Sequence, residues 1–323
     1  MHVQSDMTEK QNQNYSPNQG YNRPPAYAPV PNYNQHPALN GDQGYRALRQ
    51  HGQLLSAARG GNVQNAEQLM NEGADPNFRD IPWGRSPISQ AAEYGHAAVV
   101  SLLLSRGVNP NSLDVCGTEP SQDNTGKTPL MWAAMLGRTE ACRVLLDAGA
   151  HTTMAERDGR TPLSWASEHG RQACVKLLLE RGAPINVCDR YHGQTALSWA
   201  AMNGHMFNVI TLLEHGADPA LADRDGRQPL SWAAARGHET IVRLLLNQRG
   251  VQINQQGGKG RTSLSWAAGN GHRQVVSLLL EKGADPNLAD KDGRSPLSYA
   301  AERNQRGMVD LLLQNGAGFI AKN

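Results

Sequence analysis

A five-residue phrase, typified by Gly-Arg-Thr-Pro-Leu, recurs seven times between residue 84 and the end of the chain. Its copies begin at Gly84, Gly126, Gly159, Gly193, Gly226, Gly260 and Gly293. From the second copy onward, the copies are 33 or 34 residues apart. A fixed period of this length indicates a solenoid, in which each unit packs against its neighbours and all units share one core. Such a stack presents an extended surface, which argues against an enzyme with a buried reaction cavity.

The third copy shows how one unit is expected to fold. Thr161 is a good N-cap, and Pro162 suits the first helical position because its φ is fixed and its missing N–H costs nothing there. Gly170 ends this short helix, and Gly182 ends a second helix that we expect over 172–181. Helices this short are unstable alone in water, so their apolar faces must pack against neighbouring units. The predicted fold class is all-α.

Short motifs within each repeat resemble the ankyrin repeat family. They are Thr-Pro-Leu, Ala-Ala, Gly-His as at Gly204-His205, and Gly-Ala-Asp-Pro as at 216–219. The resemblance covers about residues 50–323 and implies a solenoid of about eight helix–turn–helix units. It also implies short turn fingers along one edge, inner helices that line a concave groove, and a protein-binding role. The variant Thr-Pro-Leu-Ser-Trp-Ala-Ala resembles repeat arrays of filamentous fungi.

The chain divides into three regions by composition. Residues 1–46 are rich in Asn, Gln, Pro and Tyr and have no apolar periodicity, so we expect a disordered tail. Residues 47–82 read as an N-terminal capping repeat that lacks the Thr-Pro start. Residues 83–323 hold seven ankyrin repeats.

The tail contains one short motif. Pro24, Pro25 and Tyr27 form a P-P-x-Y sequence, which resembles the ligand of WW domains, modules that read polyproline II helices. A WW-domain protein is therefore one candidate partner. The alternative is that the tail is a flexible linker or a low-complexity arm.

An aromatic residue occupies one place after the phrase in six of the seven copies. These residues are Trp132, Trp165, Trp199, Trp232, Trp266 and Tyr299. On a helical wheel Trp165 lies about 160° from Leu163. We therefore expect the rings to point toward the concave groove as spaced anchors that bind a partner and do not stack on one another. The alternative is that each ring packs over the neighbouring unit and buries area.

A base follows the phrase glycine in six copies, and Gln194 replaces it in the seventh. The bases are Arg85, Lys127, Arg160, Arg227, Arg261 and Arg294. We expect them on the turn edge, as a basic stripe that docks an acidic, extended partner segment. The alternative is a solvated turn in which acids such as Asp158, Asp225 and Asp292 pair locally with the bases.

The sequence shows no pattern for catalysis, because it holds no P-loop, no G-x-S-x-G, no H-E-x-x-H and no Cys/His cluster. We expect no catalytic residue, no cofactor and no metal. The Gly-His histidines recur once per unit, about 10 Å apart, and should bond to nearby backbone. Cys142 and Cys174 take the place of Val or Ile in other copies and should lie in the core. The insertion over 111–124 is either a recognition finger or neutral loop variation.

The net charge of +2 is too balanced to imply nucleic acid or an anionic membrane as the default partner. We expect a monomeric cytoplasmic or nuclear protein that is not secreted, because the first residues lack an apolar signal segment. The predicted function is a non-catalytic scaffold or adaptor that binds partner proteins on the concave ankyrin groove. Two alternatives stay open, a transcription coregulator and a stand-alone relative of the repeat half of a fungal NTPase-linked sensor.

Overall fold

The structure is a computed structural model that describes residues 42–80, 83–114 and 126–318. The chain divides after Asp42 into two units, and the described fold belongs to the second, Gln43–Asn323. All regular structure in the described residues is helical. The helices are α2 (Asp42–Gly60), α3 (Val63–Asn71), α4 (Pro87–Tyr94), α5 (Ala97–Ser105), α6 (Pro129–Met135), α7 (Thr139–Asp147), α8 (Pro162–Glu168), α9 (Gln172–Glu180), α10 (Ala196–Met202), α11 (Met206–Glu214), α12 (Pro229–Arg236), α13 (Glu239–Leu246), α14 (Ser263–Gly269), α15 (Arg273–Glu281), α16 (Pro296–Glu302) and α17 (Arg306–Gln314).

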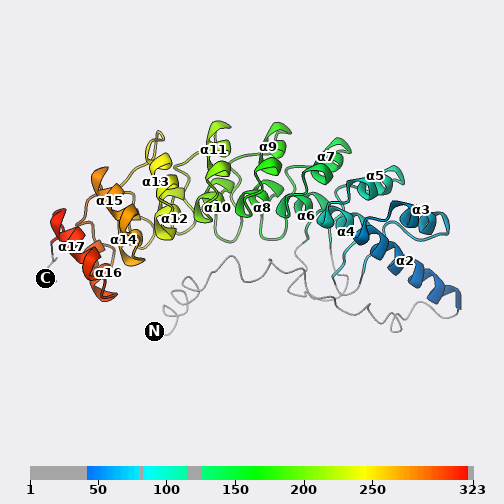
Figure 1. The fold of residues 1–323 in the computed structure, drawn as a ribbon, viewed down its shortest axis with the longest axis horizontal. Coiled ribbons are helices and arrows are strands. Elements are labelled where there is room, and N and C mark those ends of the chain that lie inside the picture. Colours follow the sequence, from blue (N-terminus) through cyan, green and yellow to red (C-terminus); the bar gives the residue numbers. More distant parts are fainter. Residues whose placement is uncertain (1–41, 81–82, 115–125, 319–323) are drawn as a thin grey trace. The chain divides into compact units, whose positions relative to one another are not determined.

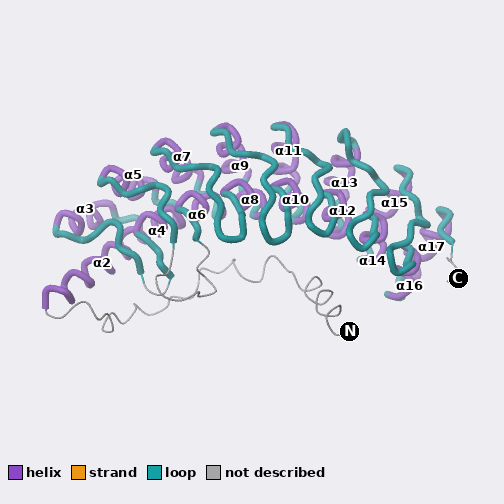
Figure 2. The backbone as a smooth tube through the Cα atoms, turned by 180° about the vertical axis from the view of Figure 1, so that it is seen from behind, coloured by secondary structure: helices purple, strands orange, loops and turns teal. Residues whose placement is uncertain are grey.

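The helices form pairs that follow one another in chain order (Figure 1). Each pair has an inner, even-numbered helix and an outer, odd-numbered one, and inner helices pack against the inner helices of the next pairs. The pairs from α2–α3 to α16–α17 confirm the predicted all-α solenoid of about eight units. Figure 2 shows the loops that connect the pairs as a row of fingers beside the inner helices.

The inner helices begin and end as local chemistry requires. The Thr161 side chain accepts a hydrogen bond from the backbone N–H of Ser164, and Pro162 takes the first helical position. The Ser164 hydroxyl in turn accepts a hydrogen bond from the backbone N–H of Thr161. This capping box satisfies backbone groups that a free helix end leaves unpaired. Gly170 has a φ of 69°, and Asn304, which replaces the glycine in the last unit, has a φ of 56°. Both confirm the predicted left-handed ends.

The core is a continuous band between inner and outer helices. Leu163, Val175 and Leu178 of one unit are all buried there, together with their counterparts in the other units. Cys142 and Cys174 are fully buried, and their Sγ atoms lie 3.9 Å apart. The prediction that these two cysteines act as core hydrophobes is confirmed.

A planar side chain joins each unit to the one before it. The His205 Nε2–H donates to the carbonyl of Glu168 over 2.7 Å, and His238 and His272 make the same bond to Met202 and Ala235. A Cβ atom on Gly170 would lie 2.7 Å from His205 Nδ1, so only glycine lets the ring pack there. The prediction that the Gly-His histidines bond to backbone is confirmed.

Helical structure begins before the predicted end of the tail at residue 46. Helix α2 begins at Asp42, so residues 42–46 are helical and do not belong to the tail. The rest of helix α2 lies in the region 47–82, which was predicted to hold the capping repeat. The remainder of the tail, with Pro24, Pro25 and Tyr27, lies outside the described residues, as do 115–125 of the long finger and the chain end from 319.

Candidate functional site

Rings and bases interleave in one column along the finger side of the inner helices. We call this column the ladder, and its members are Arg85, Trp132, Lys127, Trp165, Arg160, Trp199, Trp232, Arg227, Trp266, Arg261, Tyr299 and Arg294. Each ring comes from an inner helix, and each base comes from the end of a finger. A base typically lies over the ring of its own unit and over the ring of the next unit, which is favourable cation–π geometry.

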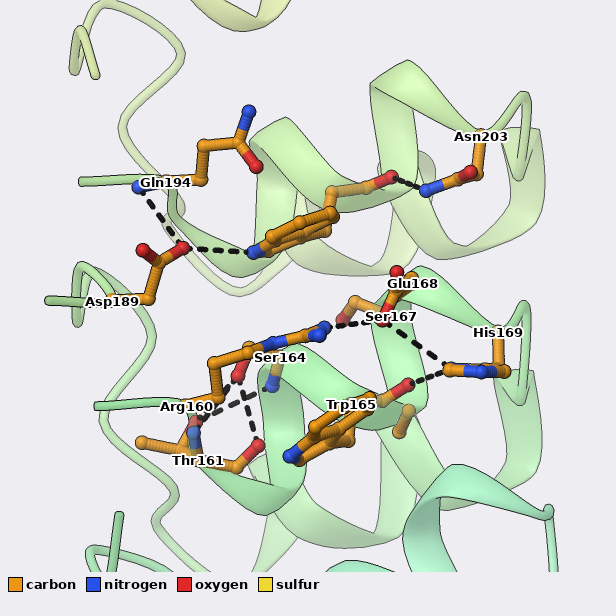
Figure 3. A network of polar contacts seen from close by, with 12 residues as sticks. Arg160, Thr161, Ser164, Trp165, Ser167, Glu168, His169, Asp189, Gln194 and Asn203 are labelled. Carbon is orange, nitrogen blue, oxygen red and sulfur yellow. Dashed lines mark hydrogen bonds and ion pairs between the residues drawn. The ribbon is translucent and has the colours of Figure 1, made fainter. Parts of the chain in front are cut away.

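The middle of the ladder is closed to solvent. The Arg160 guanidinium carbon lies 3.6 Å from the Trp165 ring centroid and 4.3 Å from that of Trp199. Figure 3 shows Arg160 extending alongside the Trp165 indole. Trp165 is 4% exposed and Trp199 is 1% exposed. Arg160 also pairs with Glu168, the last residue of helix α8, so the charge of Arg160 is compensated inside the ladder.

A buried ion pair continues the closed part. Lys127 Nζ lies 4.6 Å from the Trp165 ring centroid and 3.0 Å from a carboxylate oxygen of Glu156. The side chains of Lys127 and Glu156 are 3% and 1% exposed. Burial lowers the pKa of Lys127 and raises the pKa of Glu156, because each charge loses hydration. Each depends on the other for its charged form.

Finger carboxylates hold the polar atoms of the rings. The indole N–H groups of Trp132, Trp199 and Trp232 donate to Asp114, Asp189 and Asp223, over 2.7, 3.1 and 2.9 Å. The Tyr299 hydroxyl donates to Asp290 over 2.5 Å. These bonds fix the ring orientation, since each ring is bound at its polar edge as well as on its faces.

Asp114 is the most strongly perturbed of these carboxylates. Burial raises its pKa to about 6, and the nearby Arg85 guanidinium and the hydrogen bonds from Ser89 and Trp132 oppose the rise. Arg85 Nε lies 3.3 Å from the same carboxylate. Burial also raises the pKa of Asp223 and of Asp80 in their fingers. The finger carboxylates are therefore structural partners of the ladder.

The ladder is more open around Trp232 and Trp266 than around Trp165 and Trp199, although Tyr299 at its C-terminal end is 6% exposed. Trp232 and Trp266 are only partly buried, and the side chains of Arg227 and Arg294 are 12% and 29% exposed. Arg227 lies 4.6 Å from both ring centroids, and Arg261 lies 3.5 Å from Trp266 and 3.8 Å from Tyr299. This part presents aromatic and guanidinium surface together.

These positions correct two expectations. The picture of spaced anchors with room for partner side chains is wrong for Trp165 and Trp199, because the chain's own Lys127 and Arg160 fill the space between rings. The picture of a basic stripe on the turn edge is wrong for Lys127 and Arg160, which are buried. A helical wheel gives the direction of a side chain within one unit and says nothing of what the next unit places against it.

The carboxylates that accept from the rings are not the acids predicted to pair with the bases. The predicted acids were Asp158, Asp225 and Asp292, whereas the indole and phenol donors use a different set, Asp114, Asp189, Asp223 and Asp290. The signal was present, because Asp189, Asp223 and Asp290 each stand nine or ten residues before their ring. That spacing spans a finger, so no local helix or strand period reveals it.

Within the described residues, no group of three or more His, Cys, Asp or Glu side chains is arranged to hold a metal ion. In the same part of the chain, no helix is long and apolar enough to cross a membrane.

Comparison with known proteins agrees with the geometry. A family description, "Ankyrin repeats (3 copies)", matches residues 54–155, 112–189, 182–257 and 250–323. The chain is 36% identical over 67 residues to the mouse "2-5A-dependent ribonuclease" and 31% identical over 106 residues to the human "ARF GTPase-activating protein GIT1". It is 39% identical over 82 residues to the Hydra vulgaris "Tyrosine-protein kinase HTK16".

The matches cover a small part of these relatives. They span 21%, 33% and 25% of this chain but only 9%, 13% and 10% of the three relatives, in the same order. The shared part is the repeat, and the activities in the three names differ from one another.

Proposed function

Since the chain belongs to the ankyrin repeat family, we propose that it is a non-catalytic scaffold or adaptor that binds partner proteins on the finger side of its repeats. The observation that carries the proposal is the open part of the ladder, from Trp232 to Arg294. A family of this kind is generally an interaction module. The repeat binds through side chains that differ from one array to another, and the ladder is what distinguishes this array.

The open ladder has the composition of a binding surface. Aromatic and arginine side chains contribute a large share of the free energy at protein interfaces. Here Trp232, Trp266, Arg227 and Arg294 are already ordered by stacking and by the Asp223 and Asp290 bonds. A partner would therefore meet rigid groups, and less conformational entropy would be lost on binding.

The relatives support the same class of function. A ribonuclease, a GTPase-activating protein and a kinase each match a stretch of 67 to 106 residues of this chain. A segment common to proteins of such different activity is better suited to recognition than to one chemistry. A coregulator or a repeat relative of an NTPase-linked sensor would use the same surface for a different partner.

Site-specific photo-crosslinking tests the proposal. A photoreactive amino acid at Lys259, in the finger beside the open ladder, should crosslink a partner polypeptide in the source cells. The same residue at Lys176, whose side chain is 67% exposed on the outer helix α9, is the matched control and should give much less product. Equal crosslinking from both positions would contradict binding on the finger side.

A further inference from the structure

Five of the six ladder bases have a carboxylate of their own. Arg85 pairs with Glu93 and Asp114, Lys127 with Glu156, Arg160 with Glu168, Arg227 with Asp225, and Arg294 with Asp290 and Asp292. Each of these five bases has a nitrogen within 4.0 Å of a carboxylate oxygen of its partner. The ladder therefore compensates its positive charges internally almost everywhere.

Arg261 is the exception. No carboxylate of the described residues lies within 4.0 Å of its guanidinium, since Arg261 is missing from every ion pair found there. One Nη donates to the Ser265 carbonyl over 3.0 Å, and Nε is buried without a hydrogen-bond partner in the described part of the chain, as are the Nε atoms of Arg85, Arg160 and Arg294. Burial lowers the Arg261 pKa to about 10, and the like charges of Arg294 and Arg227 contribute.

The finger sequence explains half of this difference. Residues 223–227 read Asp-Arg-Asp-Gly-Arg, and residues 290–294 read Asp-Lys-Asp-Gly-Arg. Residues 257–261 between them read Gly-Gly-Lys-Gly-Arg. Both acids are lost, and Lys259 takes the place of one of them. The finger beside Arg261 therefore adds positive charge where its neighbours neutralise it.

The inner helix explains the other half. Arg85 and Arg160 each pair with a glutamate eight residues further on, Glu93 and Glu168. Each glutamate lies at the end of the inner helix that follows its arginine. The corresponding residue for Arg261 is Gly269. A Cβ atom on Gly269 would lie 3.2 Å from Arg261 Nη2 and 3.4 Å from Tyr299 Cβ. The position from which Glu168 reaches Arg160 thus carries no side chain beside Arg261.

We propose that the carboxylate of an Asp or Glu in an extended segment of a partner protein pairs with Arg261, which is partly exposed. The inference rests on the proposed function and names the chemistry of its partner. The partner carboxylate supplies what Glu93 and Glu168 supply elsewhere in the ladder. The adjoining faces of Trp266 and Tyr299, which enclose Arg261, position the guanidinium and make the pairing selective for a planar, bidentate acceptor.

The test uses the full-length chain and a random peptide library displayed on phage. Peptides enriched on the immobilised protein are synthesised with a fluorescent label, and their affinity is measured by anisotropy. Enriched peptides should carry Asp or Glu. Arg261→Gln should weaken their binding by about tenfold or more, the expected loss for a charge-assisted pair.

A matched pair of variants leaves Arg261 in place. Gly269→Glu provides an internal carboxylate and should weaken peptide binding by about tenfold more than Gly269→Gln, which has the same size without the charge. Thermal melts of all variants identify any loss of folding, and the Gly269 pair keeps the test valid if Arg261→Gln unfolds.

The outcomes separate the inference from the proposed function. Enriched peptides without a carboxylate, or equal affinities in Gly269→Glu and Gly269→Gln, would overturn the Arg261 inference and leave peptide binding intact. Displacement of an enriched peptide by inorganic phosphate or by a single-stranded oligonucleotide, but not by an excess of a glutamate-containing peptide, would also overturn it. Failure to enrich any peptide would count against the proposed function itself.

Discussion

The closed and open parts of the ladder are built from the same phrase but differ in burial. Trp165 and Trp199 are 4% and 1% exposed, whereas Trp232 and Trp266 are only partly buried. Met135, which stands three residues after Trp132, packs against Trp165 of the next unit. The same place in the open part carries Ala235 and Gly269. The size of this residue does not by itself decide burial, because Met202 holds the place before the partly buried Trp232 and Gly269 holds it before the buried Tyr299.

The largest test of this comparison is a pair of ring deletions. Trp199→Ala removes a fully buried indole and should lower the free energy of unfolding by about 3–5 kcal/mol. Trp266→Ala removes a partly exposed ring and should cost about 1–2 kcal/mol, because less area is lost. Urea denaturation of both variants measures the difference. Equal losses would show that exposure does not separate the two parts.

The buried ion pair of the closed part gives the second test. Glu156→Gln leaves the Lys127 ammonium buried and uncompensated, and should destabilise the protein by about 3 kcal/mol. Asp225→Asn removes the partner of Arg227 in the open part, and since that carboxylate is 63% exposed the loss should stay below about 1 kcal/mol. Denaturation at neutral pH compares the two. A double variant, Lys127→Met with Glu156→Leu, should recover most of the loss.

The small residue of the open part is not required by the fold. Gly269 lies in helix α14 and has an ordinary negative φ, so Gly269→Ala should be neutral or should stabilise the protein by up to about 1 kcal/mol. The new Cβ would lie 3.2 Å from Arg261 Nη2 and 3.4 Å from Tyr299 Cβ, so this outcome requires the guanidinium to shift slightly between its two rings. A thermal melt measures the shift. A clear loss of stability would mean that packing, and not binding, keeps this position small.

The smallest effect is a difference in acid sensitivity between the joints of the array. Two joints use Arg138 and Arg171, which bond to the carbonyls of Glu93 and Met135. The next three joints, one of them between the units of Trp165 and Trp199, use His205, His238 and His272. Burial lowers the pKa of His205 and of His238, so the folded state disfavours their protonation.

The sign follows from that direction. As pH falls below the ordinary histidine value of 6.5, the unfolded chain binds protons that the folded chain excludes, so stability falls until the lowered folded pKa is reached. His238→Gln copies the neutral joint that Gln305 makes to Gly269 in the last unit. Its free energy of unfolding should fall less between pH values above and below 6.5. An unchanged slope would contradict the assignment.

Much of the fold was predictable because it depends on chemistry within one unit. Thr161 and Pro162 determine where a helix begins, Gly170 and Asn304 determine where one ends, and all are apparent from single residues and their conformational preferences. The core positions of Cys142 and Cys174 followed from comparing copies. The histidine joints followed from the same comparison.

The sequence allowed us to predict which residues form the ladder but not how they pack against one another. The sequence gives six rings and six bases at fixed places, but the stacking of Arg160 between Trp165 and Trp199 depends on the spacing and rotation of successive units. Those quantities arise from packing between units, and a helical wheel for one unit does not contain them. The internal carboxylates that neutralise the bases come from fingers and helix ends of different units, so the unpaired state of Arg261 could be recognised only in three dimensions.

Gln194 interrupts the alternation of bases and rings. At the same place in most other units a cation lies over the rings of two neighbouring units. Gln194 instead carries a neutral amide and is 2% exposed. Coupling in a linear array passes only between neighbours, and a weaker joint limits how far unfolding spreads. We expect fraying that enters from one terminus to slow at this joint, so that amide hydrogen exchange separates the repeats before Gln194 from those after it.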